Sequence, residues 1–146
     1  MANFARNYLE TQVNTATPQR LRLMLIEGAL RLATRARDLL RQGKVGEATE
    51  AVIRCQAIVG ELGASPNPEK APELARQVTN LYKFVHRSLN DGQLQRDPQR
   101  LTDAITVLEI ERETWQLVCK QLEHRPMPHL NLSASPEAIE SLSLEA

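Results

Sequence analysis

Apolar residues recur along most of this chain at spacings of three and four, which is the period of an amphipathic α-helix. Turn-forming residues separate four long segments of this kind, at about 18–41, 45–62, 72–90 and 98–123. Thr17-Pro18 and Asp97-Pro98 are typical helix starts, because the first side chain caps free N–H groups and proline suits the first helical position. Together the segments predict an all-α fold, an antiparallel up-down four-helix bundle.

Three of the predicted helices each carry a main apolar face that we expect to be buried. The face of the second helix contains Ala48, Val52, Cys55, Val59 and Leu62. The third helix is expected to end at Asn90-Asp91-Gly92, and its face contains Leu74, Val78, Leu81, Tyr82, Val85 and Leu89. The face of the fourth helix contains Leu101, Ala104, Ile105, Leu108, Trp115, Cys119 and Leu122.

The first predicted helix differs, because it is apolar on two sides. One narrow stripe contains Leu21, Leu25, Gly28, Leu32 and Leu39. A second stripe, on roughly the opposite side, contains Leu23, Ile26, Leu30 and Ala33. A helix packed against one core needs only one stripe. The second must be covered by more of the same chain or by a partner.

Shorter segments flank the predicted bundle, which we place at residues 17–124. Residues 1–16 form a leader, in which Tyr8 needs something to pack against. Residues 125–146 form a tail, with a cap-and-proline start at Ser135-Pro136 but too few residues for a stable isolated helix. The tail either docks onto the bundle or stays disordered until something binds it.

Charge and composition narrow the classes of partner and location. The chain has 146 residues and a formal net charge of zero, which argues against nucleic acid or an anionic membrane as a partner. It has neither a signal-peptide start nor an uncharged run approaching about 18 residues. We therefore expect a cytoplasmic protein without membrane insertion. Cys55 and Cys119 are interpreted as buried small hydrophobes rather than a disulfide.

The charges are unevenly spread over the predicted helices. Residues 18–41 carry six arginines against two acids, a net charge of +4, and residues 97–123 carry a net charge of −3. Either these two helices pair with each other within the bundle, or they present solvated faces of opposite sign.

Motifs for catalysis or metal binding are missing. No histidine has glutamate three residues before it, so the di-iron pattern of some bundles does not fit, and His124 and His129 lack a third ligand. Glu109, Glu111 and Glu113 are interpreted as a solvated face. Arg112 is a polar exception near the buried stripe, and an enzyme or small-molecule carrier would need such a group. We expect a protein without enzymatic activity, cofactor or metal.

Two aromatic residues on the predicted faces have alternative interpretations. Trp115 either fills the middle of an aliphatic bundle, which we favour, or anchors a partner at a groove. Tyr82 is expected to be a core residue whose hydroxyl is hydrogen-bonded at the bundle edge.

Several short motifs follow one another along the chain in a particular order. They are Tyr8; Thr17-Pro18; Leu21; Met24-Leu25-Ile26-Glu27-Gly28-Ala29; Leu81-Tyr82; and Leu108, Arg112 and Trp115. In these motifs, over about residues 5–122, the chain resembles the FliS family, the cytoplasmic export chaperones of flagellin. Ile26 and Glu27 stand where the family has tyrosine and aspartate, which removes a hydroxyl and an aromatic surface from the second stripe.

The resemblance implies a helical bundle that binds the C-terminal segment of flagellin in hydrophobic grooves. Binding prevents premature polymerisation and keeps the subunit competent for export, and the leader shields a groove or docks at the export gate. With the two stripes, this predicts partner-binding roles for Tyr8, Leu23, Ile26, Leu30, Ile110 and Leu117. The alternatives are a helical adaptor or an export chaperone for another client, and exchange of leader or tail between two copies would give a homodimer.

Overall fold

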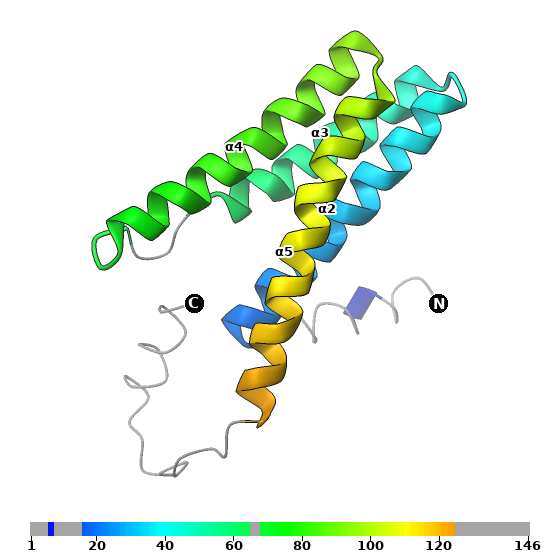
Figure 1. Cartoon of the computed structure of the whole chain (residues 1–146). Coiled ribbons are helices and arrows are strands. Elements are labelled where there is room, and N and C mark those ends of the chain that lie inside the picture. Colours follow the sequence, from blue (N-terminus) through cyan, green and yellow to red (C-terminus); the bar gives the residue numbers. More distant parts are fainter. Residues whose placement is uncertain (1–5, 8–15, 65–67, 125–146) are drawn as a thin grey trace.

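The computed structural model describes residues 6–7, 16–64 and 68–124, and the long helices in these ranges form an antiparallel bundle (Figure 1). They are α2 (Pro18–Arg41), α3 (Val45–Leu62), α4 (Pro72–Gln95) and α5 (Pro98–His124). α2 packs against α3 and α5, and α4 packs against the same two helices. The predicted all-α, up-down four-helix bundle is confirmed. Tyr8, nearly all of the leader and the whole tail lie outside the described residues.

The predicted caps are present at the starts of α2 and α5. The Thr17 side chain accepts a hydrogen bond from the Arg20 N–H at 3.1 Å, and Pro18 occupies the first position of α2. The Asp97 carboxylate accepts from the Gln99 N–H at 3.0 Å before α5. The predicted boundaries of three helices are therefore correct to within one residue.

The predicted end of α4 at Gly92 is wrong. The helix continues to Gln95, and Arg96 ends it in the left-handed conformation at φ 53°. Gly92 is buried inside α4, where an added Cβ would lie 2.7 Å from Leu101 Cδ2 and 3.2 Å from the Asp97 carbonyl oxygen. The glycine therefore permits close approach of α4 and α5 rather than ending a helix.

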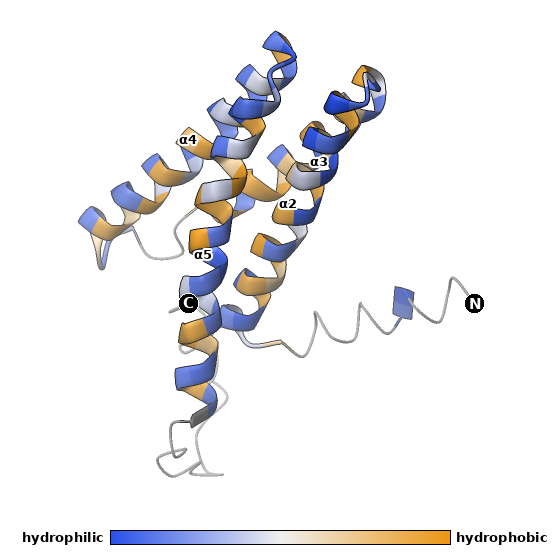
Figure 2. Cartoon of the chain, turned by 45° about the vertical axis from the view of Figure 1, so that its right-hand side comes forward, coloured by the Kyte–Doolittle hydropathy of each residue, from blue (hydrophilic) through white to orange (hydrophobic). Residues whose placement is uncertain are grey.

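The bundle is not closed evenly along its length. In both views the N-terminal part of α4 leads away from the C-terminal part of α5, while the two helices meet where α4 ends and α5 begins (Figures 1 and 2). The start of α2 stays beside the end of α5, where Arg20 and Glu123 form an ion pair at 3.8 Å. Among the described helices, the start of α4 and the end of α5 consequently do not pack against each other.

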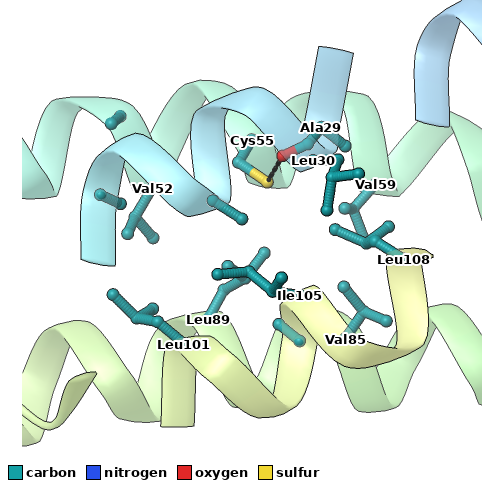
Figure 3. Close-up of a cluster of buried hydrophobic side chains, with 14 of the residues drawn as sticks. Ala29, Leu30, Val52, Cys55, Val59, Val85, Leu89, Leu101, Ile105 and Leu108 are labelled. Atoms are coloured by element: carbon teal, nitrogen blue, oxygen red, sulfur yellow. Dashed lines mark hydrogen bonds between the residues drawn. The ribbon is translucent and has the colours of Figure 1, made fainter. Parts of the chain in front are cut away.

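The core is almost entirely aliphatic, as expected (Figure 3). The predicted face of α3 is buried throughout. Within this core the Cys55 thiol donates to the Ala29 carbonyl oxygen at 3.2 Å. Burial raises the pKa of the Cys55 thiol to about 12. Cys55 and Cys119 are both free and buried, which confirms their interpretation as small hydrophobes.

The second apolar stripe of α2 is buried by the chain itself, and most of the first is partly buried. A side chain added at Gly28 would meet Ile58 Cδ1 at 3.6 Å, so the first stripe faces α3. The second stripe faces the core and α5, and Leu23, Ile26 and Leu30 are 6%, 0% and 7% exposed. The expectation that Leu23 and Ile26 line an open receiving surface is therefore wrong, whereas Leu30, although buried, lines the edge of an open hollow. Because α2 packs against α3 on one side and α5 on another, it needs apolar residues over a wide part of its circumference. The two stripes lie toward the two sides of that apolar part.

Candidate functional site

Large apolar side chains remain exposed on the described surface, and they concentrate on α4 and α5 rather than on α2. They are Ile53 of α3; Leu74, Phe84 and Leu94 of α4; and Ile110, Leu117 and Leu122 of α5. Figure 2 shows hydrophobic residues recurring along α5 into its last turns. Exposed apolar residues that gather on neighbouring elements are typical of protein-binding surfaces.

The outer face of α5 carries Ile110 and Leu117. They are seven residues apart, and therefore on the same side of the helix, with exposed fractions of 58% and 61%. Their predicted position off the main buried stripe is confirmed. Leu117 also lines an open hollow of about 660 Å³ beside Arg20 of α2. This face of α5 is available to a partner.

The diverging ends of α4 and α5 expose residues that the sequence predicted to be buried. Leu74 is 60% exposed and Leu122 is 39% exposed, and they belong to the ends at which α4 and α5 lead away from each other. Farther along, Val78 and Leu81 are partly buried and pack against the core. Phe84, which the sequence analysis did not single out, is about half exposed on α4. Apolar surface therefore continues from the core edge onto the outside of α4.

A polar contact of four helices lies at the border of the core. The Arg22 guanidinium of α2 lies 5.5 Å from the ring centre of Tyr82 in α4 and 5.2 Å from that of Trp115 in α5. Its Nη2 donates to the Leu62 carbonyl oxygen at the end of α3, at 2.9 Å. These distances suit cation–π attraction to both rings.

The sequence pattern did not identify Arg22 as a structural residue, and the residue was counted only as one of six arginines. Its spacing from a buried residue could have indicated the structural role. Arg22 precedes the buried Ile26 by four residues, which places both on the same side of α2.

The Tyr82 hydroxyl is satisfied within the bundle. The ring is buried, and the hydroxyl donates to Glu111 Oε2 at 2.9 Å. Burial, and then the nearby Glu111 carboxylate, raise the pKa of Tyr82 well above its usual range. The expectation for Tyr82 is confirmed, whereas the interpretation of Glu111 as part of a solvated face is wrong. Trp115 is partly buried and packs against the core, in agreement with its favoured structural interpretation.

The described residues contain neither a membrane-spanning helix nor a metal-binding group. No described helix has the length and apolar character needed to cross a membrane. Among residues 6–7, 16–64 and 68–124, no group of three or more His, Cys, Asp or Glu is placed to hold a metal ion. Arg112 is half-buried at the seam of α2 and α5, and it lines an open hollow rather than an internal cavity.

A helical bundle with exposed apolar side chains on two adjacent helices is the architecture of a protein-binding module. Comparison with known proteins specifies the family. The sequence model of the flagellar protein FliS matches residues 1–122, and this chain belongs to that family.

Individual relatives agree with this assignment. The flagellar secretion chaperone FliS of Salmonella typhimurium is 31% identical over 116 residues, which cover 79% of this chain and 86% of the relative. The protein of the same name from Campylobacter jejuni is 32% identical over 117 residues, covering 80% and 91%. That of Bacillus subtilis is 28% identical over 109 residues, covering 75% and 80%. The family resemblance predicted from short motifs is confirmed.

Proposed function

We propose that this protein is a cytoplasmic chaperone that binds the C-terminal segment of flagellin, prevents its premature polymerisation and keeps it competent for export. The relatives bear the name flagellar secretion chaperone, which supports a client of the flagellar export system. The single observation that carries the proposal is the exposed apolar surface of α4 and α5. In this scheme the leader, with Tyr8, contributes to docking at the export gate.

Two apolar surfaces on the bundle are the proposed contacts for the client. One is the outer face of α5 with Ile110 and Leu117, and the other is the outer side of α4 with Leu74 and Phe84. A client segment without its own core loses conformational entropy on binding. Burial of apolar side chains offsets that loss at about 25 cal/mol per Å². Amphipathic helices commonly bind to such surfaces through residues spaced one turn apart.

The bundle interior is not part of the proposed contact. Leu23 and Ile26 are already packed against the rest of the chain, and a client would have to separate helices to reach them. Binding on the outside of α4 and α5 leaves the core and the Arg22 contact intact. The chaperone therefore acts as a preformed scaffold on which the client becomes ordered.

Calorimetric titration with a flagellin C-terminal peptide tests the proposal. Wild-type protein is expected to bind, and the double variant Ile110→Glu/Leu117→Glu is expected to lose affinity by about tenfold or more. Both residues are exposed, so helicity measured by circular dichroism should be unchanged.

The matched control is Ile53→Glu, which makes the same kind of substitution at an exposed position on α3. Its affinity is expected to stay within about twofold of wild type. Failure of the wild-type protein to bind the peptide would overturn the proposed function. Equal losses in the control and the double variant would remove α5 as the contact.

A further inference from the structure

A surface of different chemistry lies along the seam between α2 and α5. Arg31 and Arg35 of α2 and Arg112 of α5 line an open hollow of about 640 Å³. Leu30 and Leu39, both largely buried, contribute apolar lining to the same hollow. The lining of the hollow therefore combines three arginines with apolar residues.

The described part of the chain leaves these cations without acceptors. Arg31 and Arg35 are exposed, and neither forms an ion pair or a side-chain hydrogen bond with a described residue. The Nε of Arg112 is buried and has no hydrogen-bond partner in the described ranges. Because that atom is closed to solvent, a ligand in the open hollow would meet the exposed side chains of Arg31 and Arg35 instead.

Two carboxylates in the same hollow restrict the kind of anion that fits. Asp38 is occupied by Arg37 at 3.4 Å and Arg41 at 3.9 Å, and Glu109 makes no ion pair with any residue of the described ranges. These negative charges oppose a phosphate group or a polyanion more strongly than a single carboxylate. A carboxylate also matches the planar fork of arginine, which binds it through two parallel hydrogen bonds.

We propose that this hollow binds an acidic side chain of the client segment, with the exposed Arg31 and Arg35 as its hydrogen-bond donors and Arg112 in its wall. The inference rests on the proposed function, and it adds that the client segment must place an acidic residue in this hollow. The second hollow on the same seam contains Leu117, about 7.5 Å farther along α5 than Arg112. A client segment with an acidic residue near an apolar one occupies both hollows at once.

The test compares two charge-reversed full-length proteins in calorimetric titrations with a flagellin C-terminal peptide. Arg31→Glu/Arg35→Glu alters the hollow, whereas Arg54→Glu/Arg87→Glu makes the same total change at exposed positions on α3 and α4. At about 50 mM salt the first variant is expected to lose affinity by about tenfold or more relative to the second. The difference should shrink at about 500 mM salt, because screening weakens exposed charge pairs.

Peptide variants then identify the occupant. Replacing each acidic residue of the peptide in turn by its amide should reveal one position that weakens binding to wild type but not to Arg31→Glu/Arg35→Glu. Equal affinities of the two protein variants, with wild type binding normally, would overturn this inference and leave the proposed function standing. The inference would also fail if neutralising Glu137, Glu140 and Glu145 of the full-length chain abolished the difference, because the chain's own tail would then be the occupant. A wild-type protein that does not bind the peptide would overturn both.

Discussion

At the scale of single residues, Arg22 has the most consequences for the fold. Its guanidinium contacts two aromatic rings and one backbone carbonyl, each supplied by a different helix. Only a planar, delocalised cation can stack on rings and donate in its own plane at the same time. The positive charge of Arg22 alone does not explain the contact.

Arg22→Lys is therefore expected to destabilise the protein by about 1–2 kcal/mol although the charge is kept. The ammonium group has no plane with which to contact both rings. Urea unfolding followed by circular dichroism measures the change. The control Arg54→Lys, at an exposed position on α3, should leave the free energy of unfolding within about 0.5 kcal/mol of wild type. Equal stabilities for Arg22→Lys and the control would show that the contact contributes nothing.

The buried thiol of Cys55 makes stability depend on alkaline pH. Its pKa is about 12 in the folded protein, against an ordinary value of 9.0, so the unfolded chain loses this proton first. Stability from this group is complete below pH 9 and falls as the pH rises toward 12. Between pH 8 and 10, wild type is expected to lose about 1.4 kcal/mol more than Cys55→Ala. Urea unfolding at both pH values measures this; parallel losses in the two proteins would contradict it.

At the scale of helices, the sequence predicted where most of them begin and end, because caps and periodicity are local properties. The exception is α4, whose Asn90-Asp91-Gly92 segment resembles a helix end but lies inside the helix. The glycine is required by contact with Leu101, which is a tertiary cause. A single sequence cannot distinguish a glycine that ends a helix from one that allows close packing.

Gly92→Ala tests this explanation of α4. Alanine normally favours a helix over glycine by about 1 kcal/mol, but here the new Cβ would overlap Leu101 and approach the Asp97 backbone. We expect a loss of about 1–3 kcal/mol in the free energy of unfolding, measured with urea.

Gly60→Ala on α3 is the matched control, since an added Cβ there meets nothing within 4 Å. It is expected to stabilise the protein by about 0.5–1 kcal/mol. A stabilised Gly92→Ala variant would mean that α4 and α5 can separate at no cost.

Predicting the site was harder than predicting the helices. Periodicity correctly showed that α2 is apolar over a wide sector, but the direction of each stripe depends on which neighbours cover it. In the structure α3 and α5 pack against α2, so Leu23 and Ile26 are buried. For Ile110 and Leu117, position off the main stripe was enough to predict exposure, because their side of α5 has no neighbour among the described helices.

At the scale of the whole molecule, opposite net charges on neighbouring helices do not translate into many ion pairs. α2 and α5 are adjacent, yet the described ion pair between them is Arg20–Glu123, with both side chains more than half exposed. Such a pair contributes at most about 1 kcal/mol. Arg31 and Arg35 of α2 remain exposed and without an ion pair among the described residues, and there they influence association more than folding.

The contact at Arg22 also determines how the bundle can come apart. Since the Arg22 cation of α2 contacts groups of α3, α4 and α5, moving any one of these helices away breaks part of a contact that joins all four. The contact therefore couples the separation of one helix to that of the others. Under the proposed function, such coupling keeps the bundle folded while a client segment becomes ordered on its surface.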